Sequence, residues 1–192
     1  YHKALGNYKK VLELDPDNPS ALYNRALVLN RLKRSAEERQ AWLDYLSMYS
    51  GGPMARQATA HLNEMGDFQY RNYLIGSRTI TLKSIRFQPV SPEIEKNSYE
   101  SLDILGNIMK NNQKVSVHIV TYQKNNSKLA EARAKSVKSY LLKKYPEIDS
   151  SRLILSWFGV SEQIKTEKKS FKADESVNFI TAVQDKKAAL RK

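Results

Sequence analysis

Apolar side chains in residues 1–65 recur at helical spacing, and helix-breaking links separate them. Ala4, Tyr8 and Val11 follow one another at intervals of four and three and precede Pro16, which predicts a helix that ends before the proline. The link at residues 15–19, Asp-Pro-Asp-Asn-Pro, cannot continue a helix. We therefore expect paired helices here, and because Tyr1 already lies inside the pattern, we expect the array to continue before it.

Two further helices and a capping helix follow. Their pattern resembles the 34-residue unit of tetratricopeptide repeats, although Arg25 replaces an apolar residue, Lys33 the usual turn glycine and Glu38 a small residue. Residues 53–65 come after a glycine pair and end at Gly66, a favourable residue just past a helix end. Such arrays present a concave surface to other proteins. The positions that match the repeat are Leu22, Tyr23, Asn24 and Ala26 in one helix and Trp42 and Tyr45 in the next.

The second half of the chain alternates between strand and helix patterns. This order predicts an α+β fold in which helices cover one face of a mixed sheet. A change of phase at Lys83 and Ser84 suggests a bulge in the first strand. The Lys-rich segment 162–173 has no apolar period and is expected to be a mobile loop. The expected elements are strands at 79–87, 114–122, 152–158 and 176–183 and helices at 98–111 and 127–144.

These patterns predict four regions. Residues 1–66 form the repeats, 67–77 a linker, 78–186 the α+β domain and 187–192 a basic tail. The linker contains Phe68, Tyr70 and Tyr73, which are too many aromatic side chains for a free tether. We therefore expect the linker to be packed.

Charge is distributed unevenly over these regions. Residues 1–70 hold 9 Lys and Arg against 8 Asp and Glu, whereas residues 71–192 hold 23 against 12, within a net charge of +12. A basic domain attracts polyanions such as nucleic acid, anionic lipid or a wall polymer with free carboxylates. No stretch approaches the ~20 apolar residues of a membrane span, and the chain has no cysteine.

The candidate site lies where the predicted strand 114–122 leads into the helix 127–144. Asn126 is placed to cap this helix. Arg133 is near its buried face and close to its N-terminus. A cation there opposes the helix dipole, so it is locally unfavourable unless an anion is present. The stretch resembles the Asn-x-x-Leu-Ser-x-x-Arg-Ala-x-x-Val pattern of OmpA-like domains. It has Asn126, Leu129, Arg133, Ala134 and Val137 in register, with Ala130 in place of Ser.

This resemblance implies a βαβαββ domain over about residues 78–184, preceded by tetratricopeptide-like helical hairpins. It also implies a pocket for the diaminopimelate residue of peptidoglycan, in which an Asp meets the ligand's ammonium group and the helix Arg takes its carboxylate. In this chain Tyr122 falls at the position of the family's Asp, and the loop that follows is shorter than the family's and lacks its Gly. The family's second pair of Arg residues, just before the last strand, is also missing. Asp174 or Glu175 could supply the anion instead. The candidate ligand-binding residues are Thr121, Tyr122, Asn126, Leu129 and Arg133.

Three functions remain open at this point. The domain could bind peptidoglycan through Arg133 with a weakened motif, or serve as a degenerate structural and interaction module whose repeats dock envelope or outer-membrane proteins. Either interpretation implies a periplasmic, outer-membrane-associated protein. Nucleic-acid binding through the basic domain is the third, but no helix-turn-helix or RNA-binding motif is present.

The sequence does not indicate an enzyme. His2, His61 and His118 are far apart and lack metal-ligand spacing, and there is no nucleophile elbow or Gly-rich phosphate loop. We expect no catalytic residue, metal or cofactor, and His118 is expected to be a packed strand residue.

Overall fold

The computed structural model describes residues 1–183, so the predicted tail at 187–192 lies outside the described residues. The chain divides into two compact units. The first contains residues 1–72 and the short segments 80–82 and 166–168. The second contains residues 73–79, 83–165 and those from Lys169 onward.

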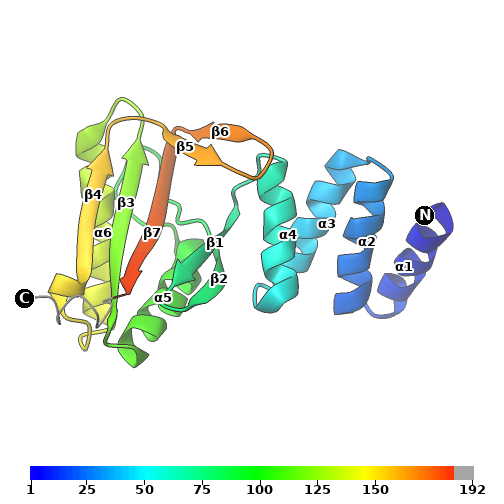
Figure 1. Ribbon diagram of the computed structural model, residues 1–192, viewed down its shortest axis with the longest axis horizontal. Helices are drawn as coiled ribbons and strands as arrows, with labels where there is room; N and C mark the ends of the chain where they lie inside the picture. Colours follow the sequence, from blue (N-terminus) through cyan, green and yellow to red (C-terminus); the bar gives the residue numbers. More distant parts are fainter. Residues whose placement is uncertain (184–192) are drawn as a thin grey trace, which may run out of the picture. The chain divides into compact units, whose positions relative to one another are not determined.

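The first unit is built from helical hairpins (Figure 1). Asn18 caps the second helix by accepting a hydrogen bond from the backbone N–H of Ala21 at 2.9 Å, and Pro19 occupies its first turn. Gly66 has a φ of 82° just past the fourth helix, a left-handed conformation that glycine adopts without strain. The four helices are α1 (His2–Leu14), α2 (Pro19–Arg31), α3 (Ser35–Met48) and α4 (Gly52–Glu64).

The core of the first unit surrounds Trp42, which is fully buried on α3. Its indole stacks on the His61 ring of α4, with 4.8 Å between centroids and 11° between planes. The edge of the Tyr23 ring packs against the same indole at 5.1 Å. These contacts join α2, α3 and α4 around one aromatic centre.

Each departure from the repeat pattern has a structural counterpart. Arg25 forms an ion pair with Asp44 of α3 at 2.5 Å. Lys33 has a φ of 56°, so it takes the left-handed turn that glycine usually occupies. The buried Glu38 accepts hydrogen bonds from Trp42 Nε1 at 3.2 Å and Asn30 Nδ2 at 2.9 Å. Arg25 and Glu38 are thus satisfied by polar partners, whereas Lys33 adopts the turn conformation itself.

The second unit contains a three-stranded sheet in the order β4-β3-β7, with β3 parallel to β4 and antiparallel to β7. Helices α5 and α6 lie on one side of it (Figure 1). The expected α+β class, with helices on a mixed sheet, is confirmed. The elements from residue 70 onward are β1 (Tyr70–Ile75), β2 (Arg78–Lys83), the 3-10 turn η1 (Lys96–Ser98), α5 (Tyr99–Asn111), β3 (Val115–Gln123), α6 (Ser127–Lys144), the 3-10 turn η2 (Ser150–Arg152), β4 (Leu153–Phe158), β5 (Glu162–Lys165), β6 (Ser170–Ala173) and β7 (Glu175–Val183).

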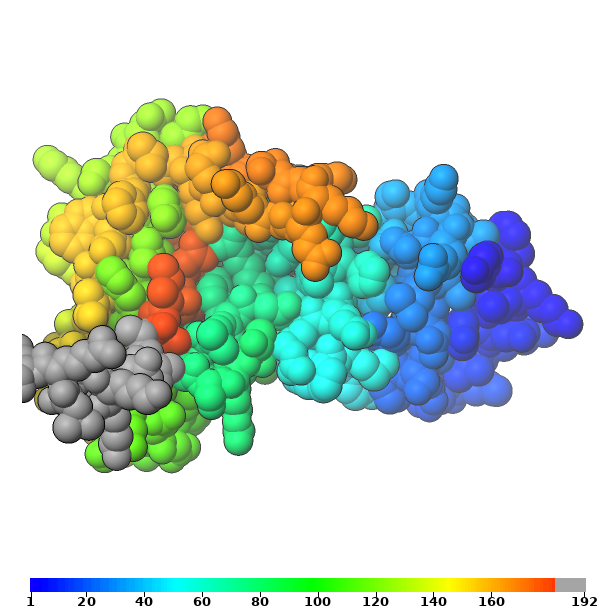
Figure 2. All heavy atoms as spheres, in the orientation of Figure 1, coloured from blue at the N-terminus to red at the C-terminus, as the bar shows by residue number. Residues whose placement is uncertain are grey.

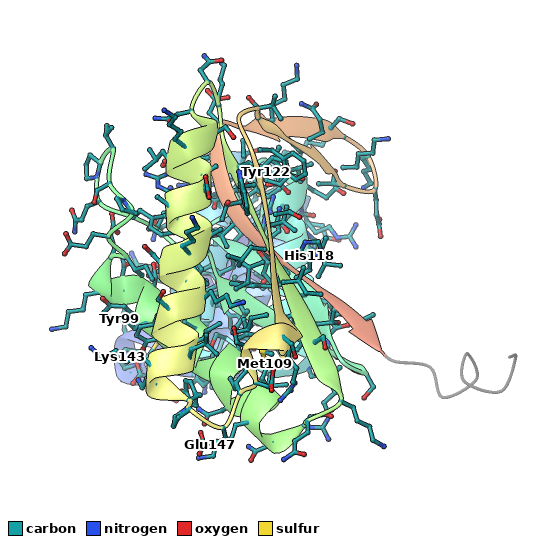
Figure 3. The ribbon with its side chains drawn as sticks, turned by 90° about the vertical axis from the view of Figure 1, so that its left-hand side faces the viewer. Tyr99, Met109, His118, Tyr122, Lys143 and Glu147 are labelled. Carbon is teal, nitrogen blue, oxygen red and sulfur yellow. The ribbon has the colours of Figure 1, made fainter. Side chains whose placement is uncertain are left out.

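Alternation along β3 separates the two faces of the sheet. Val117, Ile119 and Thr121 are buried on the face that packs against the helices. His118 and Tyr122 belong to the opposite face, and Figure 3 shows both on the side of β3 away from α6. We call this opposite side the open face.

A polar cluster fastens α5 to α6. The Asp103 carboxylate accepts hydrogen bonds from Tyr140 at 2.8 Å, Tyr145 at 3.2 Å and Lys144 at 2.6 Å. Burial alone would raise the pKa of Asp103, but hydrogen bonds from Lys144 and Tyr140 outweigh it and hold this pKa below its usual value. The Tyr145 ring also packs on Gly106, where an added Cβ would lie 2.2 Å from a ring carbon. Only glycine permits this close approach.

The expected strand 79–87 is wrong in its second half. Strand β2 ends at Lys83 and pairs with β1, which lies within the expected linker, instead of joining the main sheet. Residues 85–87 are irregular apart from a single bridge between Phe87 and Ile94. The phase change at Lys83 therefore marks the end of a strand, not a bulge.

The mobile loop expected at 162–173 is also wrong. Strands β5 and β6 form an antiparallel hairpin in which Ile164 faces Phe171. This is the only opposed apolar pair in the hairpin, and lysines surround it. The apolar alternation was therefore too short to be recognised in the sequence. Separately, none of the helices within residues 1–183 has the length and apolar character needed to cross a bilayer.

Candidate functional site

The turn between β3 and α6 is held in place by the ends of two neighbouring strands. The Asn125 N–H donates to the Gly159 carbonyl at 2.9 Å, and the Lys124 N–H donates to the Asp174 carbonyl at 2.7 Å. Asn126 then caps α6, since its side-chain oxygen accepts from the Leu129 N–H at 2.9 Å. The start of α6 is thereby fixed relative to the sheet.

Arg133 lies in the second turn of α6 and is 4% exposed. Its Nε donates to the Ser91 carbonyl at 3.1 Å, and its Nη1 donates to Gln123 Oε1 at 2.5 Å and to Glu175 Oε2 at 2.8 Å. The guanidinium carbon also lies 4.8 Å from the centre of the Phe87 ring. The cation is therefore enclosed by a carbonyl, an amide, a carboxylate and an aromatic face.

The two partners of this ion pair differ in their exposure. The Arg133 side chain is 5% exposed, whereas that of Glu175 is 52% exposed. Within residues 1–183, Arg133 Nη2 makes no hydrogen bond. The guanidinium is thus neutralised from the solvent side by a carboxylate that water can reach, while one of its nitrogens keeps unused donors.

Asp174, the other acid considered from the sequence, has different partners. Its carboxylate accepts from Ser161 Oγ at 2.7 Å and from Lys124 Nζ at 3.3 Å. The hydrogen bond from Ser161, together with Lys124, lowers the pKa of Asp174. Of the two acids, Glu175 alone pairs with Arg133 among the described contacts.

The predicted site residues do not all come together. Thr121 is buried beside α6, and its hydroxyl donates to the Ala130 carbonyl at 2.7 Å. Asn126 is an exposed cap, and Leu129 is half-buried. Tyr122 lies on the open face, where its ring stacks on Phe158 with 5.2 Å between centroids. The residue that falls at the family's Asp position thus lies on the opposite face of the sheet from Arg133.

Three partners of Arg133 were not predicted from the sequence. Gln123 lies two residues after Thr121 on β3 and so shares its face. Phe87 and Ser91 lie in the segment before α5, more than forty residues earlier in the chain than Arg133. Strand alternation could have identified Gln123, but nothing local could have indicated the other two.

The arrangement around Arg133 can hold an anion through charge and hydrogen bonding. His118 Nε2 lies 2.7 Å from Ser156 Oγ on the open face. Across residues 1–183, no three His, Cys, Asp or Glu side chains are grouped so that they could hold a metal ion. The chemistry available around Arg133 is therefore recognition by charge and hydrogen bonding.

Comparison with known families gives two matches. A sequence model of the OmpA family matches residues 86–176, a stretch that contains Arg133 and all four of its partners. A model of the TPR repeat matches residues 1–33. No curated protein matches this chain. The chain therefore carries an OmpA-family domain with a tetratricopeptide repeat N-terminal to it.

Proposed function

We propose that this chain is a non-catalytic scaffold of the bacterial cell envelope. In this proposal the OmpA-family domain acts as a structural and interaction module, and the helical repeats dock envelope or outer-membrane proteins. The chain would work in the periplasm, associated with the outer membrane. The family matches support envelope association in general terms, and the environment of Arg133 supports the more specific role.

The observation that carries the proposal is the internal neutralisation of Arg133. A ligand carboxylate would have to compete with Glu175, which already holds the guanidinium at 2.8 Å. A zwitterionic ligand would also need an anion for its ammonium group, but Tyr122 lies on the other face and Asp174 is engaged by Lys124 and Ser161. Both requirements weaken the wall-binding mode that the family resemblance implies.

Non-covalent peptidoglycan binding is the second candidate, and one observation favours it. Glu175 is half-exposed, and Nη2 of Arg133 has unused donors within the described part of the chain. A ligand carboxylate could therefore bind Nη2 while Glu175 receives the ligand's ammonium group. In this case Glu175 would replace the acid that the family places in the loop.

Sedimentation with isolated peptidoglycan sacculi separates the two functions. The proposed scaffold role predicts that neither the unaltered chain nor Arg133→Ala sediments with sacculi. Wall binding predicts that the unaltered chain sediments and that Arg133→Ala and Glu175→Gln both lose this property. Lys135→Ala is the matched control, because it removes an exposed cation from the same helix. Sedimentation of the unaltered chain that depends on both residues would overturn the scaffold proposal.

A further inference from the structure

Within its own sequence, the edge strand β4 lacks the charges and prolines that usually protect a sheet edge, although Lys138 of α6 donates to the carbonyl of its first residue, Leu153, at 2.8 Å. It is the terminal strand of the sheet among residues 1–183, so one side of its backbone has no strand partner there. Its sequence, Leu-Ile-Leu-Ser-Trp-Phe, contains no charged residue and no proline, although the chain carries 32 Lys and Arg. Edge strands normally avoid pairing by means of charges, prolines or bulges. This strand is therefore suited to pair with another strand.

Apolar side chains of β4 are exposed on both faces of the sheet. Ile154 is 50% exposed and Phe158 is 44% exposed on the open face, and Trp157 is 38% exposed on the helix-covered face. The region of β4 is also visible at the surface in Figure 2. These exposed fractions are those of the complete structure, in which β4 is already paired with β3. A partner strand would cover them.

The pattern of β4 is complementary to itself. In an antiparallel pair of two copies centred on Ser156, Ile154 would lie opposite Phe158 of the second copy and Leu155 opposite Trp157. Each pair joins two apolar side chains on one face, and the two Ser156 residues face each other. A pair centred on Leu155 would instead place Ile154 opposite Ser156 and leave Phe158 facing Arg152. The sequence of β4 thus favours one register.

We propose that β4 pairs with β4 of a second copy of this chain, in antiparallel register about Ser156, to form a continuous six-stranded sheet. The two copies would be related by a two-fold axis, so that the same surface serves on both sides. Because both copies carry a net charge of +12, their mutual repulsion opposes association. Added salt screens that repulsion and strengthens the dimer.

Analytical ultracentrifugation of the whole chain tests the dimer. The expected result is a concentration-dependent dimer that becomes tighter as salt is raised, and that Ile154→Lys abolishes. Ile180→Lys is the matched control, because Ile180 is a comparably exposed isoleucine, 57%, on β7 of the same open face. Circular dichroism establishes that both variants keep their fold. A monomer at every concentration, or equal loss of the dimer in both variants, would overturn the proposal.

Disulfide trapping tests the register. The chain has no cysteine, so Ser156→Cys introduces a single thiol that lies opposite its own copy and should form a disulfide dimer on oxidation. Ser139→Cys, on the exposed side of α6, should stay monomeric. Ile154→Cys and Phe158→Cys should cross-link only when the two proteins are mixed. Cross-linking of Ile154→Cys with itself, or none by Ser156→Cys, would contradict this register.

Discussion

Among residues 1–183, the two most deeply buried charged side chains are Glu38 in the first unit and Arg133 in the second, and they are satisfied in different ways. Both are 4% exposed. Glu38 accepts hydrogen bonds from two neutral donors, Asn30 and Trp42, which lie within eight residues of it. Arg133 donates to groups 10 and 42 residues away, one of which, Glu175, is charged. The hydrogen bonds of the Glu38 carboxylate therefore come from residues nearby in the sequence, whereas those of the Arg133 guanidinium form only when distant segments of the domain are packed together.

Replacing Arg133 by alanine should produce the largest loss. The change removes three hydrogen bonds and the stacking on Phe87, and we expect it to destabilise the second unit by about 3 kcal/mol. Hydrogen exchange of α6 and β3 peptides followed by mass spectrometry measures this unit separately. Unchanged protection in both elements would show that the enclosure of Arg133 contributes nothing to stability.

Replacing Glu38 by alanine should cost less, about 2 kcal/mol, because it leaves the buried Trp42 N–H and the Asn30 amide without an acceptor. Glu38→Gln keeps an oxygen acceptor and should be nearly neutral. Urea unfolding followed by Trp42 fluorescence in a Trp157→Phe background reports on the first unit, since the chain has two tryptophans. Equal losses for alanine and glutamine would mean that Glu38 acts through its charge.

The stability of the first unit should depend on pH through His61, whose ring stacks on Trp42. Burial lowers the pKa of His61, although Glu38 nearby acts in the opposite direction. The folded unit therefore binds this proton less readily than the unfolded chain does. The stability that follows from this difference is complete above the ordinary histidine pKa of about 6.5 and falls as the pH drops below it. His61→Phe should remove this slope in fluorescence-monitored unfolding between neutral and mildly acidic pH.

The smallest effect is expected for Glu175→Gln. The Glu175 side chain is 52% exposed, so water screens the ion pair, and the amide can still accept from Arg133. We expect a change below about 1 kcal/mol in the second unit. A loss as large as that of Arg133→Ala, measured by the same hydrogen exchange, would instead make the ion pair the main stabilising contact of the site.

Local signals in the sequence were sufficient for the helices around these two residues. The expected helix 127–144 coincides with α6, and Asn126 caps it as predicted. Both signals act over one or two helical turns. The candidate site was harder to predict from the sequence, because Gln123 of β3 lies beside Arg133 whereas its neighbour Tyr122 lies on the opposite face of the sheet. An alignment that is wrong by one residue reverses the face of a strand residue.

The sequence by itself determined the repeat helices, the α+β order and the presence of a cation one turn into α6, since each follows from the spacing of neighbouring residues. Only the tertiary structure decided that β2 pairs with β1, that 162–173 forms a hairpin and that Glu175 neutralises Arg133. These features depend on contacts between residues far apart in the chain. The stabilising free energy of these contacts arises only when distant segments pack together, so the hydrophobic periodicity of a single segment cannot predict them.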